Sequence, residues 1–258
     1  GNSVGWASPQ IVTALLVGLV LVAAFVAWEL RTDVPMLPMR FFRNATFALA
    51  NTASLFMYFG MFGSIFLLAQ FFQTVQGYSP LGSGLRFLPW TLAPMFIAPL
   101  AGALSDKIPA KNMIGVGLAM QAAALAWMAS VSTPTTPYSQ LIGPFIVAGV
   151  GMALFFAPVA NLVLSAVRPE EEGKASGANN AIRELGGVFG VAVLASIFAH
   201  VGGYGTGQSF ADGMNPALFV GAGVVALGAL AAFMIPRRPR VAEELGGEPE
   251  LAYEAEAA

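Results

Sequence analysis

Hydrophobic residues in this chain gather in long runs that are separated by short polar breaks. The hydrocarbon core of a bilayer is roughly 30 Å thick, so a helix that crosses it needs about 20 apolar residues in succession. Seven runs reach that length, and we therefore predict seven membrane-spanning helices. The runs cover residues 11–30, 46–75, 81–104, 112–131, 139–164, 175–200 and 216–235.

The third run differs from the others because it contains Pro89, Pro94 and Pro99. Proline lacks a backbone N–H and its ring clashes with the preceding helical turn. Membrane helices tolerate proline when neighbouring helices or side chains satisfy the carbonyl groups that it frees. We therefore expect this run to form a bent element.

The composition agrees with a membrane protein and excludes several other classes. Apolar residues make up 57% of the 258 residues and charged residues only 10%. There is no cysteine and a single histidine, so the sequence offers no thiolate or histidine-cluster metal site, and we expect no metal and no cofactor. No Ser/His/Asp set, paired-carboxylate site or phosphate loop is visible, which argues against an enzyme. Nucleic acid is not an expected partner.

Lysine and arginine are concentrated in alternate loops, and such residues mark the cytoplasmic side. The loops at residues 77–80, 132–138 and 201–215 contain none and are expected to face outward. This predicts a multi-pass protein of the cell (plasma) membrane with a cytoplasmic C-terminus. The basic residues of the other loops are Arg31, Arg40 and Arg43, then Lys107 and Lys111, then Arg168 and Lys174, and finally Arg237, Arg238 and Arg240.

The N-terminal and C-terminal ends of the chain each lead to a prediction. Gly1 is not a methionine, and residues 1–9 lack the basic start and cleavage site of a signal peptide, so we expect an N-terminal part to be missing. Residues from Val241 onward contain six glutamates and few apolar side chains, which predicts a disordered tail. We therefore divide the chain into a central helix with its loop (1–45), a six-helix domain (46–235) and an acidic tail (236–258).

Three ionisable residues lie inside the predicted spans. Arg86 falls near the outer end of the third run, and Arg183 and Glu184 fall about two turns into the sixth. A charge in the hydrocarbon core is costly unless it is paired or faces water, so these residues are candidates for function. The alternative is that the arginines snorkel or cap carbonyls, and adjacent residues of a helix point apart, so Arg183 and Glu184 need not form an ion pair.

Two helices carry stripes that suit a substrate path. The stripe of the second run mixes amides, a hydroxyl and aromatic rings, which lipid would disfavour, and that of the fifth run is aromatic and sulfur-containing. Packing between helices is the alternative explanation for both. The path residues proposed are Asn51, Ser54, Tyr58, Phe62 and Gln73 in the second run, and Phe145, Met152 and Phe156 in the fifth.

The loop between the third and fourth runs resembles the cytoplasmic signature loop of the major facilitator superfamily, in its second-half copy. Pro109 stands where a glycine is usual, and Ala110 where a basic residue is usual. Residues 175–192 and 143–158 are similar to stretches of the fourteen-helix drug:proton antiporters of the EmrB/QacA type. The loop residues that fit the pattern are Gly102, Leu104, Asp106, Lys107 and Lys111.

The resemblance implies an all-α integral membrane fold: the C-terminal six-helix bundle of a transporter, preceded by one central helix. It also implies alternating access with a missing N-terminal half, export of hydrophobic or cationic small molecules, and coupling to protons. Gly102, Asp106, Lys107 and Lys111 would form a conformational latch, although Asp106 as a helix cap or solvated loop residue stays open. The alternatives are a dedicated exporter of one metabolite or antibiotic, and a non-transporting membrane fragment.

Overall fold

The structure is a computed structural model that describes residues 8–33, 35–105 and 107–236. All regular elements in these ranges are helical, which confirms the predicted all-α class. Short η elements are a 3-10 turn at Met39–Arg43, a π-helical turn at Phe71–Val75 and a 3-10 turn at Pro169–Glu171. The α-helices are α1 (Pro9–Glu29), α2 (Ala45–Gln70), α3 (Pro80–Arg86), α4 (Leu88–Ser105), α5 (Ala110–Val131), α6 (Ser139–Leu164), α7 (Glu172–Val201) and α8 (Gly207–Phe233).

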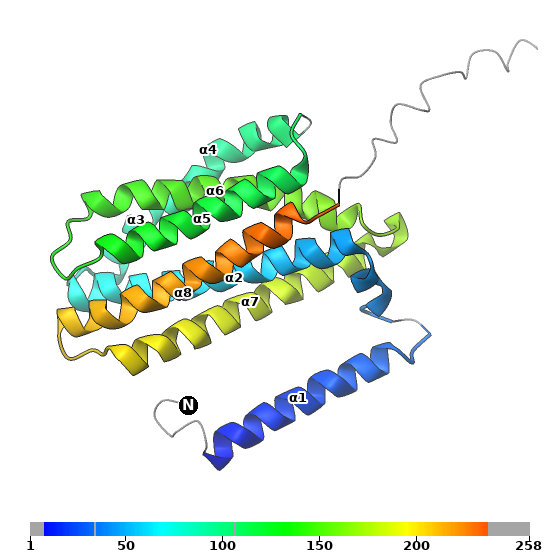
Figure 1. Cartoon of the computed structure of the whole chain (residues 1–258), viewed down its shortest axis with the longest axis horizontal. Helices are drawn as coiled ribbons and strands as arrows, with labels where there is room; N and C mark the ends of the chain where they lie inside the picture. The colour runs from blue at the N-terminus through cyan, green and yellow to red at the C-terminus, as the bar shows by residue number, and fades with distance from the viewer. Residues whose placement is uncertain (1–7, 34, 106, 237–258) are drawn as a thin grey trace, which may run out of the picture.

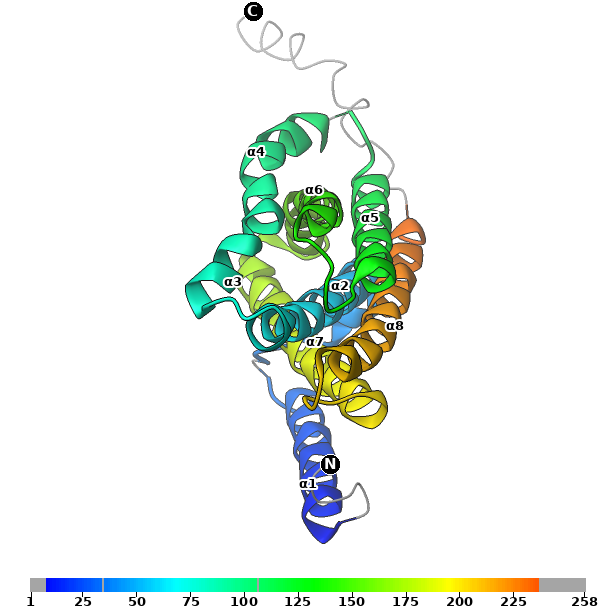
Figure 2. The same cartoon turned by 90° about the vertical axis from the view of Figure 1, so that its left-hand side faces the viewer.

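The long helices of the bundle run side by side (Figure 1). Viewed along their axes, α6 lies between α4 and α5, while α2 lies beside α7 and α8 (Figure 2). The principal contacts join α2 to α7 and α8, α5 to α6 and α8, and α4 to α6. α6 and α7 meet only sparingly, and this weak contact leaves room between them for the site described below.

Helix α1 stands clear of the bundle in both views (Figures 1 and 2). Its apolar side chains are exposed along nearly the whole length, from Val12 to Trp28. The buried exception is Glu29, whose carboxylate accepts a hydrogen bond from the Leu37 backbone N–H at 2.8 Å. An exposed surface of this kind is compatible with lipid or with another membrane segment, and not with water.

Six continuous helical segments are long and apolar enough to cross a membrane within the described ranges. The predicted third span is instead divided into α3 and α4, with the interruption at Phe87. Pro89 cannot donate a hydrogen bond to the preceding turn, and Phe87 bonds back to the carbonyl of Gly84 rather than that of Ser83. The third run is thus the bent element that its prolines predicted.

The start of the last helix was predicted wrongly. We expected a loop over residues 201–215 and a helix from Pro216, but α8 begins at Gly207. Thr206 caps the helix by accepting a hydrogen bond from the Ser209 N–H at 3.0 Å, and Pro216 is tolerated inside it. Phe210 and Met214 of this stretch are buried in the core, and Asn215 donates to the carbonyl of Ser132 at 2.9 Å, so these turns have both apolar and polar partners.

Loops that were predicted to lie on the same side of the membrane are in contact. At one end, the Gln76 side chain donates to the Thr136 carbonyl at 2.9 Å. At the other end, Asn44 donates to the Ala166 carbonyl at 2.9 Å, and Lys111 donates to the carbonyl at the end of α8 at 3.4 Å. The arrangement therefore agrees with the alternation of basic and uncharged loops.

Glycines set the closest helix contact, between α2 and α7. A Cβ added at Gly190 would lie 2.1 Å from the Phe59 carbonyl oxygen, and one added at Gly186 would lie 2.4 Å from that of Leu55. Both distances are too short for any side chain. Small residues allow membrane helices to approach until backbone packing replaces side-chain packing, which is a main source of association inside lipid.

We predict that Gly190→Ala destabilises the purified chain in detergent by about 1–3 kcal/mol, because backbone of α2 would have to move. Gly177→Ala in the same helix is the matched control, since no heavy atom lies within 4 Å of a Cβ there. Thermal unfolding midpoints of the two variants measure the difference. Equal midpoints would contradict the close α2–α7 contact.

Candidate functional site

A buried polar cluster joins α2 to α7. The Asn179 side-chain amide donates to the Asn51 side-chain oxygen at 2.9 Å and to the Ser54 hydroxyl at 3.1 Å. Asn51 and Ser54 in turn donate to backbone carbonyls of their own helix. All three residues are buried, with exposures of 4% or less. The structure therefore places two of the predicted path residues inside a helix–helix contact.

An aromatic group lies further along α2 and reaches α6. The Tyr58 and Phe62 rings stack with centroids 5.8 Å apart, and the Phe156 ring meets Tyr58 edge-on at 6.2 Å. The guanidinium of Arg183, from α7, lies 5.5 Å from the centre of the Tyr58 ring. Residues of three helices thus converge here, and Phe62 remains 42% exposed.

The remaining predicted path residues lie elsewhere. Phe145 is fully buried, and its ring packs 5.6 Å from Phe87 and 5.8 Å from Trp90. This packing fastens α6 to the broken α3–α4 element. Met152 is half-buried and packs on the core, and Gln73 is exposed in the π-helical turn. Gln73 and Phe145 therefore lie about 22 Å and about 17 Å along their helices from Tyr58 and Phe156, whereas Met152 is one turn from Phe156 on α6.

Arg183 and Glu184 point into two different cavities. Arg183 lines a pocket of about 150 Å³ between α6 and α7, and Glu184 lines a groove of about 400 Å³ that includes Phe62. Neither residue forms an ion pair within the described ranges. Arg183 follows the start of α7 by eleven residues, which is about 17 Å of helix, so it lies well inside the span.

The exposed faces of the bundle divide into two kinds. On α6 and α7 the exposed residues include the polar side chains Asn161, Asn180 and Glu184, beside apolar ones such as Val188 and Phe189. On α5 and the middle of α8 they are apolar, with Trp127 and Leu227 among the largest. Amides and charges are costly in lipid, so the apolar faces of α5 and α8 suit contact with lipid, whereas the polar residues exposed on α6 and α7 need water or protein around them.

Arg86, the last residue of α3, is enclosed by aromatic rings. Its guanidinium lies 3.2 Å from the centre of the Tyr78 ring and donates to the Gly82 carbonyl at 2.9 Å. The Tyr138 hydroxyl donates to the Arg86 carbonyl at 3.0 Å. Burial raises the pKa of Tyr138 above its usual value, and the positive charge of Arg86 opposes that rise. The hydroxyl therefore stays protonated and can donate. These contacts connect α3 to α6.

The predicted latch loop is placed only in part. Asp106 lies outside the described residues. Gly102 lies in α4, Lys107 is exposed, and the Lys111 ammonium donates to the Phe233 carbonyl at 3.4 Å. Lys111 therefore connects the start of α5 to the end of α8.

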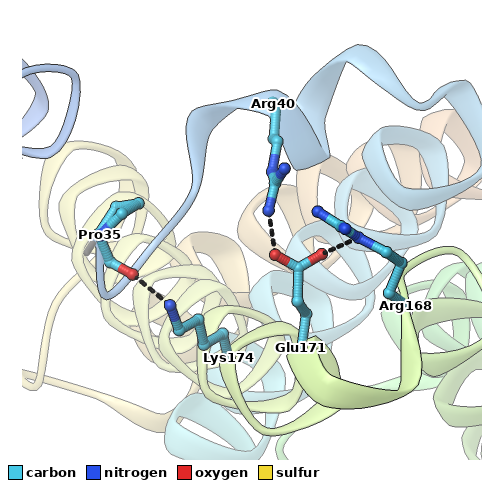
Figure 3. A network of polar contacts seen from close by, with 5 residues as sticks. All are labelled: Pro35, Arg40, Arg168, Glu171 and Lys174. Carbon is cyan, nitrogen blue, oxygen red and sulfur yellow. Dashed lines mark hydrogen bonds and ion pairs between the residues drawn. The ribbon is translucent and has the colours of Figure 1, made fainter. Parts of the chain in front are cut away.

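A second polar network at the same end was not predicted (Figure 3). Glu171 pairs with Arg40 and with Arg168, the latter at 3.4 Å. Lys174 donates to the Pro35 carbonyl at 2.7 Å. The network therefore fastens the α1–α2 loop to the start of α7.

The sequence of the chain matches a known family along most of its length. The model of the Major Facilitator Superfamily matches residues 1–191 and again 52–256. The chain belongs to this family. It is thus a multi-pass membrane protein of a transporter family and not an enzyme, as the signature loop and the sixth run indicated.

Individual members of the superfamily are also similar in sequence to this chain. Multidrug resistance protein Stp of Mycobacterium tuberculosis is 35% identical over 77% of this chain and 37% of its own length. Multidrug export protein EmrB of Escherichia coli is 27% identical over 78% of this chain and 39% of its own length. The uncharacterized MFS-type transporter YcnB of Bacillus subtilis is 26% identical over 94% and 52%. The chain therefore spans between about a third and a half of these relatives.

Asn179, Asn180 and Glu171 are the residues of the site that sequence reasoning missed. Asn179 and Asn180 had a visible signal, since two adjacent amides inside an apolar run need partners or water. Nothing in the spacing of Glu171, however, indicates that it meets Arg40, which lies 131 residues away.

We predict that Asn179→Leu destabilises the chain by about 1–3 kcal/mol, because it leaves the buried amide of Asn51 and the hydroxyl of Ser54 short of a partner. Asn180→Leu is the matched control, since Asn180 is exposed. Unfolding midpoints in detergent measure both effects. An equal loss in the two variants would contradict the buried cluster.

Glu171→Gln should free the α1–α2 loop, because it removes the charge that pairs with both arginines. Trypsin cleaves after arginine, and this loop offers Arg31, Arg40 and Arg43. The arginine side of both pairs is exposed to solvent, so we expect the rate of cleavage to rise only about threefold to fivefold. Glu170→Gln provides the control, as Glu170 is exposed and outside the network. Unchanged cleavage in Glu171→Gln would show that the network does not hold the loop.

Proposed function

We propose that this chain is the C-terminal part of a proton-coupled multidrug efflux transporter of the plasma membrane that works by alternating access. Its six-helix domain, α2 to α8, would rock against an N-terminal half, with the substrate bound between them. The basic loops and the C-terminus would face the cytoplasm. The expected partners are the lipid bilayer, hydrophobic or cationic small molecules, protons and the N-terminal half.

One observation carries this proposal: α6 and α7 expose amides and a carboxylate, which the exposed faces of α5 and of the middle of α8 lack. Asn161, Asn180 and Glu184 lie exposed where lipid would be unfavourable. A surface with amides, one carboxylate and the exposed ring of Phe62 suits a partly hydrated cavity that binds amphipathic compounds. The relatives named for multidrug resistance and multidrug export support the same substrate class.

Protons can supply the required energy. One proton that moves through roughly 150 mV releases about 3.5 kcal/mol, which supports an accumulation of about three-hundredfold. Glu184 is the one carboxylate of the described bundle that lies deep in a span. Its groove is mostly apolar, and we assign the main proton-binding carboxylates to the N-terminal half.

Two alternatives make different predictions. A dedicated exporter would move one metabolite or antibiotic, and a resistance profile against chemically unrelated compounds distinguishes it from a multidrug transporter. A non-transporting membrane fragment would show no net movement of any compound, even together with the N-terminal half.

For the full-length transporter we predict that Asp106→Asn lowers proton-driven dye efflux from vesicles by roughly tenfold, because the latch would lose its charge. Asp33→Asn, an exposed aspartate in another loop of the same side, should leave efflux unchanged. Efflux at the wild-type rate in Asp106→Asn would remove the latch from the proposal.

Glu184→Gln in the same vesicles should retain efflux that depends on the pH gradient, with a rate within about a factor of three of wild type. Glu172→Gln, at the exposed start of α7, serves as the control. If Glu184→Gln abolished coupling while dye still bound, the assignment of the proton carboxylates to the N-terminal half would be wrong.

A further inference from the structure

The pocket between α6 and α7 is rich in hydrogen-bond donors and lacks a negative charge. Its polar wall comes from α7 and consists of Ser176, Asn179, Asn180 and Arg183, while α6 supplies an apolar wall. Glu184, the nearest acidic residue along the chain, lines the other cavity. The guanidinium of Arg183, the amide of Asn180 and the hydroxyl of Ser176 are donors that suit an anion.

The Arg183 guanidinium is only partly satisfied. Its Nε atom is buried and has no hydrogen-bond partner, and Arg183 forms no ion pair within the described ranges. The contact with the Tyr58 ring, at 5.5 Å, holds the group without neutralising it. A half-buried guanidinium in a membrane span, with no acidic partner within the described ranges, favours a partner that carries negative charge.

The amide next to it is already oriented. Asn179 donates to Asn51 and Ser54, so its N–H groups are not available to an anion, and these bonds fix the side chain as part of the pocket wall. Asn180 is exposed at the mouth. Arginine binds planar oxygen anions in bidentate fashion, and a carboxylate is the planar anion most common in drug-sized molecules.

The two cavities follow each other along α7. The polar pocket is lined by residues 176–183 and the groove by residues 184–192. Their midpoints are about eight residues apart, or about 12 Å of helix, and the groove is rotated around α7 toward α2, which supplies Phe62. A molecule that enters both cavities must therefore follow this turn of the α7 surface. The pocket, of about 150 Å³, has room for a carboxylate but not for a whole dye, whereas the groove of about 400 Å³ is mostly apolar.

We propose that the Arg183 pocket binds the carboxylate of amphipathic substrates, whose apolar part lies in the groove beside Phe62. Zwitterionic and acidic compounds would then join the hydrophobic and cationic ones as substrates. This inference rests on the proposed transport function, because it takes the α6–α7 side to be the substrate cavity.

Binding of two dyes to the purified full-length transporter tests this directly. Rhodamine B carries a free carboxylate, and its methyl ester is otherwise the same molecule. Arg183→Gln should weaken the binding of rhodamine B at least tenfold and leave the binding of the ester within about twofold. Arg183→Lys, which keeps the charge but not the planar fork, should give an intermediate loss for rhodamine B.

Two further variants control the result. Arg31→Gln removes an exposed arginine outside the bundle and should change neither dye. Asn180→Asp places a negative charge at the exposed mouth, so it should weaken rhodamine B and not the ester, even if Arg183→Gln does not fold. An equal effect of Arg183→Gln and of Asn180→Asp on both dyes, or no effect on either, would overturn the inference.

The outcomes separate this inference from the transport proposal. If an acidic side chain of the N-terminal half occupied the pocket, Arg183→Gln would lower the stability of the protein without changing its preference between the dyes, and the inference would fall. Binding that discriminates as predicted, without proton-driven efflux of either dye, would support the pocket and contradict the transport proposal. Equal efflux of both dyes by wild type and by Arg183→Gln would support the transport proposal and contradict the carboxylate site.

Discussion

The hydrocarbon core of the membrane imposes the constraint on which the rest of this structure depends: each polar group inside it must have a partner or face water. The chain meets this constraint in two ways. Asn179 binds Asn51 and Ser54, which removes three polar side chains from lipid and joins α7 to α2. Arg183 and Glu184 remain unpaired within the described ranges, and this restricts their side of the bundle to contact with water or protein.

The close packing of α2 on α7 and the pocket of Arg183 both follow from how tightly each neighbouring helix packs against α7. α2 and α7 approach until a Cβ at Gly190 would lie 2.1 Å from a backbone oxygen, so this pair forms the rigid part of the domain. α6 is held instead by α5 and α4 and meets α7 only sparingly. The pocket of Arg183 exists because one helix pair is packed tightly and the neighbouring pair is not.

The sequence was sufficient for the helices that depend on hydrophobicity alone, such as α6, whose bounds of 139 and 164 were predicted. It was insufficient wherever a polar residue has a distant partner. The stretch from Gly207 to Asn215 reads as a loop but is helical, with Asn215 bonded to Ser132, and Asn179 bonds across 128 residues of chain. The separation of Arg183 and Glu184 could be foreseen because adjacent helical residues point about 100° apart, but the cavities that they enter could not.

The central claim is that the α6–α7 side of the bundle is hydrated while α5 and α8 face lipid, and cysteine accessibility tests it most directly. The chain has no cysteine of its own, so single substitutions can be placed in a cysteine-free version of the full-length protein. A membrane-impermeant thiol reagent should label Asn180→Cys and Val188→Cys in membrane vesicles, and should not label Ala123→Cys or Leu227→Cys. Equal labelling of all four positions, or labelling of the α5 and α8 positions alone, would contradict the account.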